Sequence, residues 1–312
     1  MFSVIIPLYN KAPYICRAID SVLQQSHMGF EVIVINDGST DGGDRLVEKR
    51  YGNQVHLIHQ ANQGVSAARN RGISEAQGAY IAFLDADDFW HMDFLTCMEK
   101  VIEKYPDAGI LGSTYITEGE LKGERLISPE IRILDNYFQT ASYNTWYTSS
   151  STVIKKDFFT YNQGFKPHLT KGEDLDVWFR AIAFYGKGYY VNHALMHYDQ
   201  QASQTQENFS CIERTIFAEM VEEDYPSKAM SSYGAWLDFR VKFLALNLLP
   251  YYGISHNKEG IKRIWGAVSM PFTFLLWVYY LPFNSLQKFV GSNILRKWHR
   301  KYSKFCIRYI YP

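Results

Sequence analysis

The sequence predicts an α/β fold with a mostly parallel central sheet and flanking helices, followed by a C-terminal helical extension. Four short runs rich in β-branched and aromatic residues occur early in the chain, at 2–9, 31–36, 55–59 and 80–85. Such runs are typical of strands buried on both faces. Because helical patterns separate these runs, right-handed crossovers and a parallel sheet are expected.

Two segments between the strands have apolar residues at helical spacing. Residues 14–25 carry one apolar stripe, and residues 64–77 place Val65, Ala68 and Ile73 on another. A stripe of this kind marks the face that a helix buries against a sheet.

The rest of the chain is predicted in less detail. Residues 107–160 resemble strands and loops, and 164–185 a loop that leads into a helix. The polar, aperiodic stretch 199–210 indicates a mobile loop. Residues 211–224 and 228–249 have the pattern of amphipathic helices.

Charge is unevenly distributed along a chain whose 32 basic and 32 acidic residues balance. The last acidic residue is Glu259, and residues 260–312 carry nine basic ones, so the first 259 residues have a net charge of −9. This segregation argues against a nucleic-acid binder and favours an anionic partner at the C-terminal end, with the membrane surface as the leading candidate.

The C-terminal region is both apolar and basic. Residues 264–287 contain no charged side chain, and 294–309 form an amphipathic helical pattern. The length would allow a membrane span. Pro271, Pro282 and the many aromatic residues favour a segment in the headgroup region, whereas a true span and a core helix stay open.

Cysteine usage and the N-terminus bear on location. The four cysteines lie far apart without a CxxC pair, which indicates neither a zinc site nor a disulfide framework. The N-terminal residues do not have the pattern of a secretion signal. We expect a protein on the cytoplasmic face of the cell membrane, either peripheral or monotopic.

Polar residues follow three of the predicted strands. Tyr9 and Asn10 follow the first, residues 37–41 follow the second, and residues 85–88 follow the fourth. Ligands of such sheets bind outside the carboxyl ends of the strands, so these loops are expected to share one crevice. Within 37–41, Gly38 would let the backbone approach a ligand, and the following residues would turn the chain and cap the next helix.

Two acidic clusters are candidate sites. In "DADD", Asp85 and Asp87 would project to one side, and hard oxygen ligands favour magnesium or manganese over zinc. A solvated turn or a helix cap explains the same residues. In "GEDLDVW", Glu173 and Asp174 would lie at a helix start, where acidic residues commonly cap, or one of them acts as a general base.

Four ordered blocks point to a family: "FSVIIPLYNKAPYICRAIDSVLQQS", "EVIVINDGSTDGG", "NQGVSAARNRGISEAQGAYIAFLDADD" and "GFKPHLTKGEDLDVWFRA". Together they resemble the family 2 glycosyltransferases, inverting enzymes of the GT-A fold, over about residues 2–185. With this resemblance we expect a GT-A domain over 1–210. The helical patterns predict an extension over 211–260, and the apolar and basic pattern predicts a membrane-associating region over 261–312.

The resemblance also implies a nucleotide-sugar donor, most often a UDP-sugar. By this implication Pro7 and Tyr9 border the nucleotide base. Asp37 hydrogen-bonds the uracil or ribose, Arg69 lies near the nucleotide, and Asp85 faces the ribose or the metal.

Two further roles follow from the same resemblance. Asp87 would ligate a divalent cation, manganese or magnesium, that neutralises the departing diphosphate. Asp174 would be the base that takes the proton of the acceptor hydroxyl, with Glu173 as a neighbour or acceptor contact.

The chain departs from the family pattern after the base. Tyr198 stands where members often have an arginine, so a cationic contact to the diphosphate is missing or is supplied elsewhere. His193 or His197 could complete the metal shell, although a packed or exposed histidine is the favoured interpretation of each.

The leading hypothesis is a bacterial, membrane-associated glycosyltransferase of cell-surface polysaccharide synthesis. Its partners would be a nucleotide-sugar, a glycan or lipid-linked acceptor, and anionic lipids. Two alternatives stay open: a catalytically silent nucleotide-sugar-binding scaffold, and transfer to a polyprenol phosphate. Neither the sugar nor the acceptor can be read from the sequence.

Overall fold

The structure is a computed structural model of the 312-residue chain. It describes residues 1–121, 125–126, 128–141, 144, 146–200, 212–222, 224–228 and 230–247, and single positions at 294, 297–298, 301–302 and 305.

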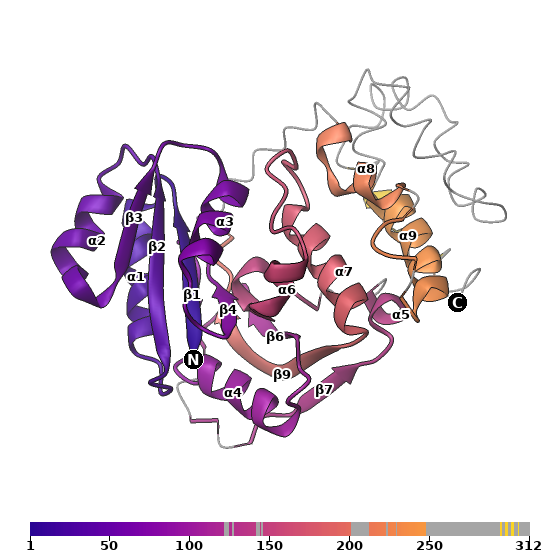
Figure 1. Cartoon of the computed structure of the whole chain (residues 1–312), viewed down its shortest axis with the longest axis horizontal. Helices are drawn as coiled ribbons and strands as arrows, with labels where there is room; N and C mark the ends of the chain where they lie inside the picture. Colours follow the sequence, from indigo (N-terminus) through magenta and orange to yellow (C-terminus); the bar gives the residue numbers. More distant parts are fainter. Residues whose placement is uncertain are drawn as a thin grey trace. The chain divides into compact units, whose positions relative to one another are not determined.

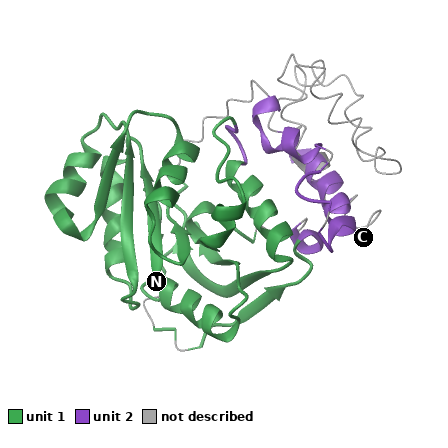
Figure 2. Ribbon diagram, in the orientation of Figure 1, with its two compact units in different colours: residues 1–137, 145–168, 173–205 green, residues 138–144, 169–172, 206–312 purple. Residues whose placement is uncertain are grey.

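The chain divides into two compact units, coloured separately in Figure 2. Unit 1 contains residues 1–137, 145–168 and 173–205, and unit 2 contains residues 138–144, 169–172 and 206–312. The three-region division expected from the sequence stays a prediction.

The N-terminal part of unit 1 is the parallel sheet that the sequence predicts. Its strands are β1 (Phe2–Leu8), β2 (Phe30–Asp37), β3 (His56–Gln60) and β4 (Tyr80–Phe83), in the order β3-β2-β1-β4 (Figure 1). Ile5 of β1 is aligned with Ile33 on one side and Phe83 on the other, and all three are fully buried. Because β4 ends at Phe83, the acidic turn lies beyond the strand rather than inside it.

The helices of this part fall close to the predicted segments. They are α1 (Ala12–Leu23), α2 (Gly43–Tyr51), which the 3₁₀ turn η1 (Gly52–Gln54) follows, and α3 (Val65–Glu75). The apolar stripe of α1 is buried as expected, at Ile15, Ala18, Ile19 and Val22.

The second half of the sheet corrects the expectation of a mostly parallel sheet. The described part of the chain forms one nine-stranded sheet in which β4 is followed by β8, β6, β9 and β5, with β7 paired to β9. The added strands are β5 (Phe89–Trp90), β6 (Ile110–Ile116), β7 (Ile131–Leu134), β8 (Thr152–Lys155) and β9 (Gly188–His197). Four of these strand pairings are antiparallel and only β6 with β9 is parallel. The sheet is therefore mixed, because the strand-helix repeat that enforces parallel pairing stops after β4.

Short and long helices connect these strands. They are α4 (Phe94–Lys104), α5 (Tyr137–Ala141), the 3₁₀ turn η2 (Ser149–Ser151), α6 (Asp157–Tyr161) and α7 (Glu173–Tyr185). The predicted loop and helix over 164–185 are thus present, with α7 as the helix.

The two amphipathic helices predicted over 211–224 and 228–249 differ from the elements of unit 2. Instead of one helix over 211–224, there is a 3₁₀ turn, η3 (Ile212–Arg214), and a short α8 (Ile216–Met220). Between them, Thr215 forms a β-bridge with Lys171, which interrupts a continuous helix. The second helix, α9 (Tyr233–Asn247), starts later than predicted.

The buried side chains of α9 do not form a single stripe. Trp236, Phe239 and Val241 are each at most 3% exposed, although they point to different faces of the helix. An aromatic neighbour accounts for part of this burial, since the Phe138 ring centroid lies 5.0 Å from that of Trp236.

The predictions for the C-terminal region fall largely outside the described residues. This holds for most of the loop 199–210, for the apolar segment 264–287, and for most of 294–309. No helix within the described ranges has both the length and the apolar character needed to cross a bilayer.

The packing of α3 differs from its predicted stripe. Its buried residues are Ser66, Ala68, Arg69 and Gly72, whereas Val65 is 39% exposed. A Cβ atom at Gly72 would lie 2.4 Å from the Cγ2 atom of Ile5, so the missing side chain is what allows α3 to approach β1 closely.

We predict that Gly72→Ala destabilises the protein, because the added methyl group overlaps a fully buried strand residue. The expected loss is about 1–3 kcal/mol in the free energy of unfolding, measured by urea denaturation. Gly234→Ala is the matched control, since Gly234 is also helical but a Cβ atom there meets open space. Equal unfolding curves for the two variants would contradict the close packing of α3.

Candidate active site

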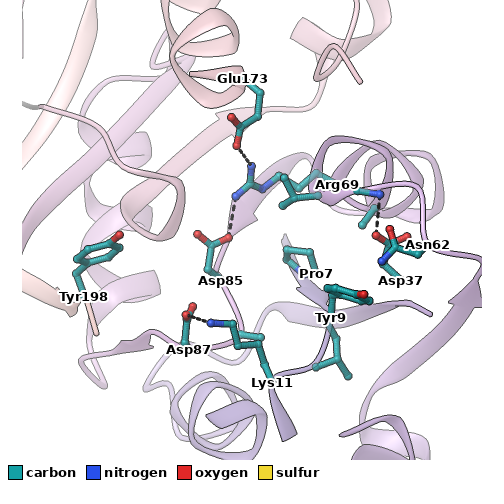
Figure 3. Close-up of a pocket in the computed structure, with 15 residues that line it drawn as sticks. Pro7, Tyr9, Lys11, Asp37, Asn62, Arg69, Asp85, Asp87, Glu173 and Tyr198 are labelled. Carbon is teal, nitrogen blue, oxygen red and sulfur yellow. Dashed lines mark hydrogen bonds and ion pairs between the residues drawn. The ribbon is translucent and has the colours of Figure 1, made fainter. Parts of the chain in front are cut away.

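A pocket of about 520 Å³ lies at the carboxyl ends of β1, β2 and β4 (Figure 3). Six of the seven predicted site residues line it: Pro7, Tyr9, Asp37, Arg69, Asp85 and Asp87. The seventh, Asp174, is not among the lining residues. The shared crevice expected from the strand ends is therefore present.

The loop after β2 is held by its own side chains. The Asp41 carboxylate accepts the backbone N–H groups of Ala12 at 2.7 Å and Gly43 at 3.0 Å, the first residues of α1 and α2. Free N–H groups at a helix start need such acceptors. Asp41 thus accepts the first N–H group of two helices, although the N-cap residues are Lys11 and Gly42 and neither caps its helix with a side chain.

Asp37 is buried at the pocket wall, with 3% of its surface exposed. Its carboxylate accepts hydrogen bonds from the Gln60 side chain (2.8 Å) and from the backbone N–H groups of Gln63 (2.9 Å) and Gly64 (2.8 Å). Asp37 therefore fastens the loop that leads into α3. These bonds also fix the orientation of the carboxylate toward the pocket.

Gly38, which was expected to let the backbone approach a ligand, lies against the backbone of Asn62. Its φ is +71°, and a Cβ atom would lie 2.9 Å from the backbone nitrogen of Asn62. The close approach that requires glycine here is thus made by the protein's own loop.

Arg69 joins two parts of the site. Its Nη2 lies 2.8 Å from Asp85 Oδ1 and its Nη1 lies 3.3 Å from Glu173 Oε1, while its side chain is only 3% exposed (Figure 3). The guanidinium also lies over the Phe165 ring, 5.1 Å from its centroid. Burial lowers the pKa of Arg69, but the charges of Asp85 and Glu173 outweigh this effect and raise the pKa above its ordinary value.

The acidic turn after β4 presents two carboxylates to the pocket and turns the third away. Asp85 and Asp87 both line the pocket, and Lys11 Nζ lies 2.6 Å from Asp87 Oδ2. Asp88 is 1% exposed and accepts the Ser150 hydroxyl and, at 2.9 Å, the backbone N–H of Asp199. Burial, followed by repulsion from Asp85, raises the pKa of Asp88 to about 7.

The donor set fits a divalent cation that arrives with its substrate. Within the described residues no group of three potential metal ligands occurs. Magnesium typically uses only one or two carboxylates and takes further oxygens from phosphates, which Asp85 and Asp87 could match.

Neither candidate histidine lines the pocket. His197 is stacked on Phe89, with ring centroids 4.7 Å apart and an interplanar angle of 12°. His197 is therefore a packed histidine at the end of β9.

The two acidic residues that start α7 have different surroundings. Glu173 lines the pocket and pairs with Arg69. Asp174 Oδ1 accepts the backbone N–H of Leu175 at 2.8 Å, and its Oδ2 lies 3.4 Å from the Ser149 hydroxyl. Burial and the adjacent Glu173 charge raise the pKa of Asp174 to about 6, against the opposing effect of Arg69.

Three polar side chains of the pocket had no role assigned from the sequence: Lys11, Asn62 and Tyr198. Lys11 directly follows the Tyr9-Asn10 strand end, so the strand-end rule would have included it if extended by one residue. Asn62 is the first residue of the block "NQGVSAARNRGISEAQGAYIAFLDADD", but the resemblance gave it no separate role. Tyr198 was noted only as the residue that replaces an arginine.

The comparisons with known proteins agree with this geometry. The model of the family described as Glycosyl transferase family 2 matches residues 3–163. TuaG of Bacillus subtilis, a glycosyltransferase named for teichuronic acid biosynthesis, is 30% identical over 203 residues, covering 64% of this chain and 78% of TuaG. A Rickettsia felis glycosyltransferase is 44% identical over 177 residues, which are 56% of this chain but only 29% of that relative.

Solved structures show the same fold at low sequence identity. The S. aureus TarS 1–349 structure has a TM-score of 0.66 at 18% identity, covering 88% of this chain and 82% of TarS 1–349. A TarS complex with UDP-GlcNAc matches equally well, with a TM-score of 0.66. The fold is thus of the GT-A type, and with the family model spanning more than half of its length the chain belongs to glycosyl transferase family 2.

Proposed function

We propose that the chain is an inverting glycosyltransferase that moves a sugar from a nucleotide-sugar, a UDP-sugar in the first instance, to a hydroxyl of a glycan or lipid-linked acceptor. The observation that carries the proposal is the pocket itself. It brings together an aromatic wall, a fixed carboxylate and an acidic pair at the ends of β1, β2 and β4.

The order of the residues along the pocket favours one orientation of the donor. Pro7 and Tyr9 offer a flat wall for the base, and Asp37 lies beside them with an oriented acceptor (Figure 3). Asp85 and Asp87 lie farther along the pocket, where the diphosphate would follow. The TarS complex supports the donor class, since that fold relative binds UDP-GlcNAc.

A divalent cation, manganese or magnesium, would be held by Asp87 with Asp85 beside it. When bound, it would neutralise the charge that develops on the departing nucleoside diphosphate. Arg69 would keep Asp85 oriented toward this position through the ion pair at 2.8 Å.

Asp174 is the proposed base, with Glu173 as the second candidate. Glu173 lines the pocket, but its carboxylate is already paired with Arg69. The pKa of Asp174 is raised to about 6 by burial and by the Glu173 charge, which suits a base that works near neutral pH. Asp174 does not line the pocket. It stays the candidate base, because a catalytic contact is often completed only when substrates bind.

The reaction is tested by turnover of a panel of UDP-sugars with manganese, together with Asp174→Asn. The amide keeps the acceptor for the Leu175 N–H but cannot take a proton, so turnover should fall about a hundred- to ten-thousand-fold while the donor dissociation constant stays constant. Glu173→Gln is the matched variant and should retain more activity. The opposite ranking of the two variants would make Glu173 the base.

The pH dependence gives a separate test of the base. Because Asp174 must be deprotonated to act, turnover should rise as the pH increases through about 6. Glu173→Gln removes a charge that raises the pKa of Asp174, so its rising limb should shift to lower pH. If the rising part of the curve of kcat against pH does not shift in Glu173→Gln, the titrating group is not Asp174. The measurement is kcat as a function of pH with saturating donor.

The basic C-terminal region supports our proposals for the acceptor and the location. Its described residues Ile294, Trp298 and Phe305 are helical and 50%, 62% and 55% exposed, and the sequence pattern of 294–309 predicts that they share one face of a helix. Exposed apolar residues among basic ones suit the headgroup region of an anionic membrane. We therefore propose that the chain acts at the cytoplasmic face of the cell membrane, where lipid-linked acceptors are accessible.

Membrane association predicts binding of the full chain to vesicles with phosphatidylglycerol and weaker binding to phosphatidylcholine alone. Trp298→Ala and Lys297→Glu should each weaken binding about fivefold or more, because the first removes an exposed ring that would insert into the headgroup region and the second reverses a surface charge. Lys49→Glu, at an exposed position on α2, is the control for charge. Equal binding of the chain to both vesicle types, measured by co-sedimentation, would contradict the proposal.

Transfer to a polyprenol phosphate can be distinguished from glycoside formation by the acid stability of the product. A sugar transferred to a polyprenol phosphate is released by mild acid, whereas a glycoside is stable. A silent scaffold would bind UDP-sugars without any turnover.

A further inference from the structure

The pocket contains one basic side chain whose role the proposed function leaves open. Among its described lining residues, Lys11 and Arg69 are the basic ones. Arg69 is buried and bound to two carboxylates. Lys11 is 24% exposed in its side chain, and its ammonium group lies 2.6 Å from Asp87 Oδ2 (Figure 3).

Tyr198, the other lining residue on this side of the pocket, supplies no positive charge. A tyrosine hydroxyl is either neutral or negative, so it offers no counter-charge for a diphosphate. Among the described lining residues, Lys11 is therefore the basic side chain that lies beside Asp87.

We propose that Lys11 exchanges partners when the donor binds. In the empty pocket it neutralises Asp87, and in the donor complex a divalent cation takes Asp87 while Lys11 binds the diphosphate. The inference rests on the proposed function and adds to it a residue that couples binding of the cation to binding of the nucleotide.

The backbone on both sides of the exchange is held in place. Lys11 immediately precedes the first residue of α1, so its backbone is anchored by that helix. The backbone carbonyl of Asp87 accepts a hydrogen bond from Arg17, which also pairs with Asp199 at 2.8 Å. Only the flexible side chain of Lys11 has to move, and an ammonium group on four methylenes is suited to such a movement.

The exchange makes binding of the two ligands cooperative. A divalent cation alone must displace Lys11 from Asp87, so it binds weakly. When a diphosphate is present, it offers Lys11 a new anionic partner and supplies further oxygens to the cation. By linkage, each ligand then raises the affinity for the other by the same factor.

The test measures manganese binding by electron paramagnetic resonance, with and without UDP, in the full chain and in Lys11→Met. Without nucleotide, the variant should bind manganese about tenfold more tightly than the unmodified chain, because the competing charge-assisted bond is gone. With manganese present, it should bind UDP about tenfold more weakly, whereas uridine, which has no phosphate, should bind equally to both proteins.

Two further variants separate a specific role from a general charge effect. Lys49→Met removes an exposed lysine of α2 outside the pocket and should change neither affinity. Lys11→Arg keeps a cation and should recover most of the affinity for UDP.

The outcomes distinguish this inference from the function on which it rests. If Lys11→Met binds manganese without nucleotide as the unmodified chain does, the exchange is wrong even though UDP binds normally. If the unmodified chain binds neither UDP nor manganese with UDP, the proposed function is wrong and the exchange falls with it.

Discussion

The site is organised around a positive charge that water hardly reaches. Arg69 holds its guanidinium between Asp85, in the turn after β4, and Glu173, at the start of α7. A buried charge is tolerated only when its partners are in place, and losing one partner leaves an uncompensated charge. Arg69 therefore ties the acidic turn, α3 and α7 into one arrangement. Gly72, one turn farther along α3, lets that helix approach β1 closely enough for Arg69 to reach both carboxylates.

The charges in the pocket explain why a cation and an anionic substrate would bind together. Asp37, Asp85, Asp87 and Glu173 line the pocket, and among the described lining residues Lys11 and Arg69 are the basic ones that oppose them. A nucleoside diphosphate adds more negative charge, which would be repelled without a further cation. The pocket carboxylates and the diphosphate thus both need a positive counter-charge. This shared requirement is the physical basis for the proposed exchange at Lys11.

Hydrogen bonds from the antiparallel half of the molecule's sheet region hold the acidic turn of the site in place. Ser150 of η2 accepts the backbone N–H of Asp85 at 3.0 Å and donates its hydroxyl proton to Asp88. Asp88 in turn holds the backbone N–H of Asp199, just after Tyr198. The third carboxylate of "DADD" is therefore structural: it connects the acidic turn to the segment that follows β9 and positions Tyr198 in the pocket wall.

The sequence by itself determined the parallel half of the sheet, because each strand is a local apolar run. It also predicted that Tyr9, Asp37, Asp85 and Asp87 lie together, because parallel strands bring their carboxyl ends to one edge. Pro7 and Arg69 were expected in the pocket from the family resemblance alone. Only the tertiary structure decided the antiparallel pairings of β5, β7 and β8, since partners far apart in the chain leave no local pattern. It also decided that Glu173 rather than Asp174 reaches the pocket, and that Lys11 pairs with Asp87. Neighbouring carboxylates look equivalent in a sequence, and only the direction in which the helix and the turn present each side chain separates them.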